Sequence, residues 1–145
     1  MKAIQVRTQG GPEALELCEL PDPIPNNGEV LVCVHTSGVN FVDVYYREGK
    51  YKAPLPFIPG IEAAGHVEAL GEGVSDFSIG DAVVWFGPLG SCAEKAVVPV
   101  HWLVKIPDGM PLDISAALIN QGLTTYILSH LTFALQPGNT CVVPE

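Results

Sequence analysis

Short stretches in which apolar and polar residues alternate recur between Met1 and Ile106, and clusters of Gly, Pro and Asn separate them. Alternation with a period of two is typical of strands that bury one face, and such clusters mark turns. Many short strands at close spacing indicate a barrel-like β unit. The pattern predicts strands at residues 1–6, 15–20, 29–36, 65–70, 81–86, 93–98 and 103–106.

Helical patterns interrupt these strands once and then follow them. Residues 41–48 suit a short helix. A second helix is expected to start at Asp113 or Ser115, and a third to run over residues 124–135 until a Pro-Gly pair stops it. The β-branched residues in the segment 140–143 then predict a buried strand. The expected fold class is mainly β with α.

Composition and charge restrict the classes of function. The chain has 145 residues, of which 48% are hydrophobic, and this is enough for about one domain with a buried core. The net charge is −9 and the seven Lys and Arg residues are scattered, so nucleic acids and anionic membrane surfaces are poor partners. No apolar run approaches the roughly 20 residues of a membrane-spanning helix, and no secretory signal precedes the first strand. We therefore expect a cytoplasmic protein.

The cysteines and histidines do not form a recognisable metal site. The four cysteines lie far apart without Cys-x-x-Cys spacing, and a chain without a secretory signal usually keeps its thiols reduced. Cys33 and His35 point to one face of a predicted strand and could form half of a site, but no third donor is recognisable nearby. His66, His101 and His130 are isolated in their segments. We therefore assign no metal and interpret Cys33 and His35 as ordinary side chains of one sheet face.

Two motifs in the first half of the chain have the frame of a metal site without its ligands. They are Val39-Asn40-Phe41-Val42-Asp43 and Pro59-Gly60-Ile61-Glu62-Ala63-Ala64-Gly65-His66-Val67. A catalytic zinc ion needs three thiolate, imidazole or carboxylate donors and one open position, and neither Asn40 nor Ile61 supplies such a donor. The second motif is not a nucleotide-binding turn, because it precedes a strand and does not join a strand to a helix.

These motifs and the segments around them resemble, in order and spacing, the zinc-free quinone oxidoreductase (zeta-crystallin-like) branch of the medium-chain dehydrogenase/reductase superfamily. The resemblance implies that Asn40, Ile61 and Gln121 stand where zinc alcohol dehydrogenases have a cysteine, a histidine and a second cysteine. Glu62 remains, and the cysteine-rich lobe for structural zinc is missing. The segments that carry the resemblance are residues 1–4, 10–13, 28–32, 37–43, 57–65, 74–83, 116–118 and 121–126.

The resemblance also implies a fold and a domain division. Residues 1–120 correspond to a GroES-like β-barrel on the substrate side, and residues 121–145 to a linking helix and the first strand of an otherwise absent Rossmann domain. In the family a glycine-rich turn follows that strand and holds the dinucleotide at a helix N-terminus. Here the sequence reads Pro144-Glu145 instead. We expect the chain alone to bind no NADPH.

The activity that the resemblance implies is zinc-independent hydride transfer from NADPH to a quinone or an activated enone. The nicotinamide carries the hydride, while the protein orients it and polarises the acceptor. The implied catalytic residues are Asn40 and Tyr46, and the implied cofactor-binding residues are Asn40, Gln121 and Thr124. Gln121 and Thr124 could instead simply start a helix. Two other functions stay open: a catalytically inactive GroES-like binding or interaction module, and a chaperonin-like cofactor on fold analogy alone.

Four of the residues in these motifs and in the helix after them have a structural interpretation as well. Asn40 can cap the helix that follows it, because an amide oxygen accepts hydrogen bonds from the free N–H groups of a first turn. Asp43 can favour the same helix end through the helix dipole. Tyr46 can be a half-exposed packing residue. Glu62, in a glycine-flanked turn, can be a buried structural acceptor.

The last part of the chain predicts self-association. Residues 116–119, 126–128 and 141–143 are apolar, and in the resembled family they would pack on the nucleotide-binding domain. A large exposed apolar patch usually marks an interface, and a strand with a free edge can pair with another chain. We expect a homodimer or higher assembly that covers these segments, or else disorder from about Thr124 onward.

Overall fold

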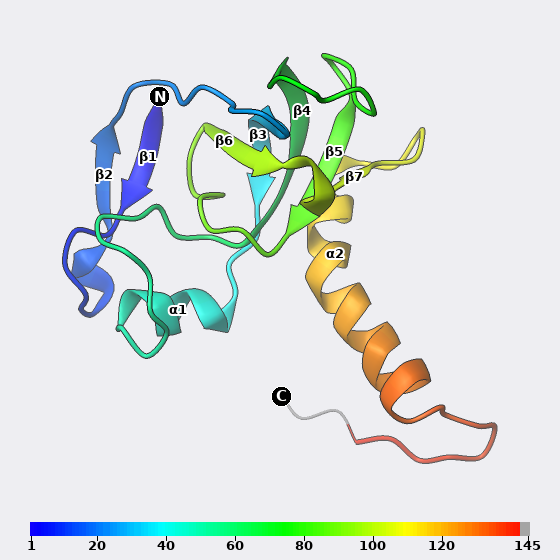
Figure 1. The fold of residues 1–145 in the computed structure, drawn as a ribbon. Coiled ribbons are helices and arrows are strands. Elements are labelled where there is room, and N and C mark those ends of the chain that lie inside the picture. Colours follow the sequence, from blue (N-terminus) through cyan, green and yellow to red (C-terminus); the bar gives the residue numbers. More distant parts are fainter. Residues whose placement is uncertain (143–145) are drawn as a thin grey trace.

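The computed structural model describes residues 1–142, which form two sheets followed by a long helix (Figure 1). Strands β1 (Lys2–Gln5) and β2 (Glu16–Glu19) make an antiparallel hairpin with a 3₁₀ turn at Pro12–Ala14 between them. The second sheet has the strand order β6-β3-β4-β5-β7, and all neighbours are antiparallel. Its strands are β3 (Glu29–Ser37), β4 (Glu62–Leu70), β5 (Ala82–Phe86), β6 (Lys95–Pro99) and β7 (Leu103–Lys105). The predicted mainly β fold class with α is confirmed.

One buried cluster receives side chains from every strand of the larger sheet. Successive side chains of a strand point to opposite faces, so each strand turns every second residue inward. The inward residues include Val32 from β3, Val67 from β4, Trp85 from β5, Val98 from β6 and Leu103 from β7. The alternating pattern that predicted the strands therefore also marks the residues that the sheet encloses.

Strand β4 begins at Glu62, three positions before the predicted start at residue 65. Glycines flank this segment, and the sequence alone favoured a turn. In the structure Gly65 pairs with Val34 of β3, and a Cβ atom at Gly65 would overlap the backbone carbonyl of Cys33. This glycine therefore lies where two strands approach each other too closely for a side chain.

The two helices predicted after residue 112 are one continuous helix. Helix α2 (Leu112–Tyr126) passes through Gly122 and continues into a π-helical turn at Ile127–Thr132. One glycine costs a helix only about 1 kcal/mol relative to alanine, so Gly122 does not separate two elements. The helix also starts at Leu112 rather than at the predicted positions, after the N-cap residue Pro111. The domain boundary expected between residues 120 and 121 lies inside α2.

Helix α2 begins on the barrel and then leaves it. It contacts β3, β4 and β5 near its start, and Figure 1 shows its second half extending away from both sheets. The shorter helix α1 (Phe41–Arg47) follows β3, and the Arg47 guanidinium donates to the Gly10 carbonyl at 3.1 Å, which ties α1 to the β1–β2 connection.

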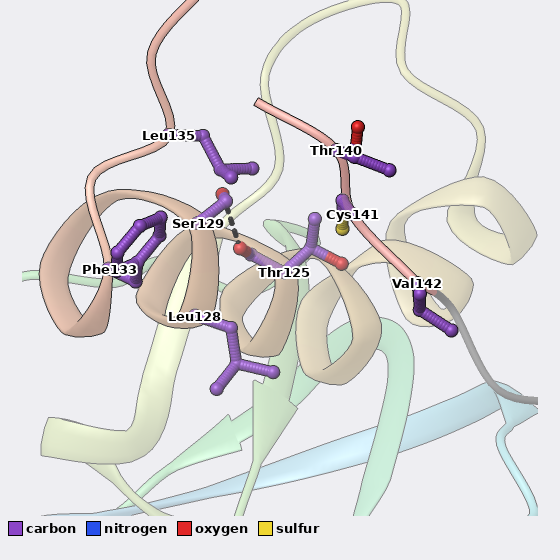
Figure 2. A pocket seen from close by; sticks show the side chains of 8 residues that line it. All are labelled: Thr125, Leu128, Ser129, Phe133, Leu135, Thr140, Cys141 and Val142. Atoms are coloured by element: carbon purple, nitrogen blue, oxygen red, sulfur yellow. Dashed lines mark hydrogen bonds between the residues drawn. The ribbon is translucent and has the colours of Figure 1, made fainter. Parts of the chain in front are cut away.

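The buried strand predicted at residues 140–143 is wrong for residues 140–142, which have no regular structure, and residue 143 lies outside the described part. A strand needs a neighbouring strand for its backbone hydrogen bonds, and no strand of residues 1–142 pairs with this segment. Residues 140–142 lie instead along the π-helical turn that ends α2, and they line a cavity of about 410 Å³ with Leu128, Phe133 and Leu135 (Figure 2).

Candidate functional site

The two sequence motifs meet helix α2 at the end of β3. The side-chain oxygen Oδ1 of Asn40 accepts a hydrogen bond from Asn120 Nδ2 at 2.8 Å and another from Gln121 Nε2 at 3.2 Å. The structure thus brings together Asn40 and Gln121, two of the predicted cofactor-binding residues, whose role at a cofactor stays a prediction. It adds Asn120, which the sequence analysis missed although it is an amide residue directly before Gln121.

Asn40 occupies the N-cap position of α1, as predicted, but its amide oxygen bonds α2 and makes no capping hydrogen bond to the first turn. Asp43 completes this helix start through the backbone. The Asn40 backbone N–H donates to Asp43 Oδ2 at 2.8 Å, and the Asp43 N–H donates to the Asn40 carbonyl at 3.0 Å. Burial raises the pKa of Asp43, while the backbone N–H groups of Asn40 and Gly60 act in the opposite direction. Asp43 therefore positions Asn40 through the backbone and leaves the amide of Asn40 to face α2.

Three buried side-chain atoms within residues 1–142 have no hydrogen-bond partner, and all three belong to the two motifs. They are Asn40 Nδ2, Asp43 Oδ1 and Glu62 Oε2. Glu62 is buried, as expected, with 2% of its surface exposed, and it presses on Gly38, where a Cβ atom would overlap its carboxylate. Buried polar atoms almost always find partners in folded proteins, so this concentration of exceptions makes the two motifs the candidate site.

A network of small polar side chains lies behind the motifs. The Ser37 hydroxyl lies 2.7 Å from that of Ser91 and also donates to the Glu62 carbonyl at 3.2 Å. Cys92 follows in the same loop, and burial, together with the charge of Asp43, raises the pKa of its thiol. The network joins the end of β3 to the start of β4 and holds the two motifs in place.

The two remaining predicted site residues lie at the edge of this arrangement. Tyr46 is half-buried in α1, and its ring packs edge-on against Tyr51 with centroids 5.5 Å apart. No hydrogen bond in the described part of the chain joins Tyr46 to Asn40 or to α2. Thr124 is exposed and lies three positions after Gln121, so the two share one face of α2. The packing role of Tyr46 is present, and the catalytic role stays a prediction.

The sheet face that carries Cys33 and His35 has one more candidate donor than the sequence suggested. His66 is the cross-strand partner of Cys33, and all three side chains are exposed. The β3–β4 register shifts between Val34 and Thr36, beside His35. Over residues 1–142, no three His, Cys, Asp or Glu side chains come close enough to hold a metal ion. The same residues include no helix with the length and hydropathy that crossing a bilayer requires.

Comparisons with known proteins agree with the motifs. Residues 26–108 match the family model of the alcohol dehydrogenase GroES-like domain. The chain is 43% identical over 141 residues to the quinone oxidoreductase of Pseudomonas aeruginosa and 41% identical over 143 residues to the probable quinone oxidoreductase of Schizosaccharomyces pombe. These matches cover 96% and 97% of this chain, and 43% of each relative.

A solved structure extends the similarity to the fold. The Escherichia coli quinone oxidoreductase complexed with NADPH superposes with a TM-score of 0.91 at 33% identity, over 94% of this chain and 43% of that chain. The present chain therefore spans less than half the length of the relatives it matches. Because more than half of its residues fit the family model, the chain belongs to the alcohol dehydrogenase GroES-like domain family, and its relatives are quinone oxidoreductases of the medium-chain dehydrogenase/reductase superfamily.

Proposed function

We propose that this chain is the substrate-side part of an NADPH-dependent reductase that transfers hydride to a quinone or an activated enone without zinc. The main support is the buried, unpaired Nδ2 of Asn40, the one hydrogen-bond donor among the three buried, unpaired side-chain atoms of the described residues. Leaving such an atom unpaired costs stability, and a role in binding or catalysis is one reason for which a fold keeps this cost. The names of the relatives support the reaction class, and the Escherichia coli complex supports NADPH as the cofactor.

The side chains at the site suit a nicotinamide and a carbonyl group better than a metal ion. The Asn40 oxygen already accepts two amide hydrogen bonds, and its Nδ2 remains as a donor for a carbonyl oxygen. Gln121 and Thr124 would hold the nicotinamide from one face of α2, and Tyr46 is the proposed second donor. An amide or a phenol carries less positive charge than zinc, so these donors suit acceptors that are already electron-poor, such as quinones and activated enones.

The bound cofactor supplies the hydride. The residues of this chain orient the acceptor and stabilise the negative charge that develops on its oxygen. Donors placed in advance at that oxygen are effective because they need not reorganise during the reaction. Asp43 contributes by holding the backbone of Asn40, and it does not contact the acceptor in this proposal.

A chimera tests the proposal. Residues 1–142 would replace the matching part of the Pseudomonas aeruginosa quinone oxidoreductase, and NADPH oxidation would be followed with duroquinone, whose methylated ring resists addition of thiols. We expect turnover, and we expect Asn40→Leu to lower kcat about 100-fold, as loss of one stabilising donor does elsewhere. A matched variant on the same loop, Val39→Ala, should retain turnover. A chimera that binds NADPH but does not reduce the quinone would support the inactive binding module instead.

The isolated chain should behave differently from the chimera. The glycine-rich turn that holds a dinucleotide pyrophosphate is not among residues 1–142, and one face of a nicotinamide site provides little of the binding energy. We expect no heat of NADPH binding in calorimetric titrations at about micromolar protein concentrations. Micromolar affinity of the isolated chain would show that the nucleotide is held in another way.

A further inference from the structure

We propose that Asn120 is a positioning residue, which fixes the side-chain amide of Asn40 so that Nδ2 is offered to the acceptor carbonyl. This inference deepens the proposed function and rests on it. It starts from one contact between residues 80 positions apart, the 2.8 Å hydrogen bond from Asn120 Nδ2 to Asn40 Oδ1.

The amide of an asparagine has two ends of nearly equal size and opposite chemistry. Its oxygen accepts hydrogen bonds, and its nitrogen donates them. A rotation of Asn40 by half a turn about its last side-chain bond would place its own N–H groups against the donating groups of Asn120 and Gln121. Donors facing donors form no hydrogen bond, so the two α2 amides select the orientation in which the Asn40 oxygen faces them.

Asn120 is the stronger of the two selecting groups. Its hydrogen bond to Asn40 is 2.8 Å long, compared with 3.2 Å for that of Gln121. Asn120 is also half-buried, whereas Gln121 is exposed, where water competes for its amide. Gln121 therefore keeps the freedom to contact a cofactor, while Asn120 holds Asn40.

The selected orientation determines which class of ligand fits. With its oxygen engaged, Asn40 has only Nδ2 left, and this atom is buried and unpaired. A buried N–H group gains most from an oxygen acceptor, and hydride transfer to a carbonyl concentrates negative charge on such an oxygen. In the opposite orientation the amide oxygen of Asn40 would face the acceptor oxygen and repel it. Asn120 would thus favour carbonyl acceptors without touching them.

Asn120→Asp separates this role from mere packing, because the two side chains have almost the same shape while the carboxylate cannot donate. NMR of the isolated chain would follow the side-chain amide of Asn40. In the variant we expect this amide to rotate, its protons to show nuclear Overhauser contacts with the β-protons of residue 120, and its exchange with water to slow. Asn27→Asp, at an exposed amide, is the control and should leave Asn40 unchanged.

Unchanged Asn40 amide signals in Asn120→Asp would overturn the inference, because they would mean that Asn120 already presents its oxygen. If that variant does not fold, Asn120→Leu provides the second test, since it removes the shorter of the two hydrogen bonds to the Asn40 oxygen and leaves only that of Gln121. The side-chain amide signals of Asn40 should then shift, and unchanged signals would likewise overturn the inference.

The chimera adds a kinetic measurement that distinguishes this inference from the proposed function. We expect Asn120→Asp to lower kcat for duroquinone reduction by about tenfold or more, because a donor to the developing charge is turned away, with little change in the KM for NADPH. A fall in kcat together with an equally large rise in the KM for NADPH would indicate a general distortion and count against positioning. Absence of turnover in the unsubstituted chimera would sink the proposed function, while the NMR result would still decide the orientation of Asn40.

Discussion

Asn40 combines a structural and a chemical task through different atoms. Its backbone N–H and carbonyl begin α1 together with Asp43, and its side-chain oxygen accepts from α2. Only Nδ2 is left over. Of the two interpretations that the sequence left open for this residue, the predicted cap by the amide oxygen is wrong, because that oxygen bonds α2 and only the backbone of Asn40 begins α1. The site role stays a prediction.

Asp43 should make stability depend on pH. Its pKa is raised in the folded chain, chiefly by burial, so folding favours the protonated form. The stabilising contribution is then complete below the unfolded pKa of about 4 and is lost as pH rises through the higher folded value. We expect Asp43→Asn to gain stability relative to the unsubstituted chain between about pH 4 and pH 7, as measured by urea unfolding. The exposed Asp108→Asn is the control, and a difference between chain and variant that does not change with pH would contradict the expectation.

Cys92 should be the slowest thiol in the site region to react. Burial and the nearby charge of Asp43 raise its pKa, so less of it is thiolate at a given pH, and thiolate is the reactive form. Cys33 is exposed. We expect iodoacetamide to label Cys92 about tenfold or more slowly than Cys33 at about pH 8, followed by peptide mass spectrometry. Equal rates in the folded chain, with equal rates also in urea, would show that Cys92 is accessible and ionised.

The sequence predicted part of the site and missed the rest for a physical reason. Asn40 and Gln121 belong to segments whose order and spacing resemble a family, so they could be named without knowing their positions in space. Asn120 could not be named in this way, because its role depends on which face of α2 points toward Asn40. The sequence pattern also divided this helix into two. Tertiary contacts, rather than local preference, determine which face this is.

The secondary structure elements were more predictable than their ends. Strands with one buried face were evident from alternation, since burial in a barrel requires a period of two. Glycines were ambiguous at this scale. Gly65 lies inside β4 because β3 comes too close for a side chain, and Gly122 lies inside α2 with open space around it. The identity of the residue alone does not distinguish these two contexts, but an alanine substitution at each glycine does.

Alanine at these two glycines should have opposite effects. At Gly65 the new Cβ would overlap the Cys33 carbonyl, and overpacking of this kind costs typically about 1–3 kcal/mol. At Gly122 the nearest atom is the Leu118 Cβ at 4.0 Å, and alanine favours a helix over glycine by about 1 kcal/mol. Urea unfolding should therefore show Gly65→Ala destabilised and Gly122→Ala stabilised. The same sign for both variants would contradict the contexts that the structure assigns.

At the scale of the whole molecule, net charge and exposed apolar surface have opposite effects on self-association. The net charge of −9 repels a second copy of the chain. The same charge makes nucleic acids poor partners. The exclusion of nucleic acids and the cytoplasmic location both stay predictions. The second half of α2 and the following turn, however, extend away from both sheets (Figure 1), and large apolar side chains along α2 and this turn are exposed. These are Leu118, Leu123, Tyr126, Ile127, Leu128, Leu131 and Phe133, each at least 46% exposed.

This surface should make the purified chain associate with itself. Residues 124–132 are helical, so the disorder considered as an alternative does not describe them. Exposed apolar area of this kind is unfavourable in water, and in a purified solution the one partner that can cover it is a second copy. We expect sedimentation velocity to show a concentration-dependent dimer or larger assembly, and added salt to strengthen it, because screening at about 0.5 M salt removes much of the repulsion between like charges.

Two substitutions locate the interface. Leu123→Glu together with Leu131→Glu places charge on the helical surface and should shift the chain to monomer, since a buried unpaired carboxylate would disfavour the contact. Ile24→Glu is the matched control, because Ile24 is a large apolar residue with 84% exposure in the connection between β2 and β3, and it should leave the assembly intact. A strict monomer at high concentration, combined with slow hydrogen exchange throughout residues 124–132, would mean that the helix is stable without a cover and that its apolar surface has no partner in a second copy.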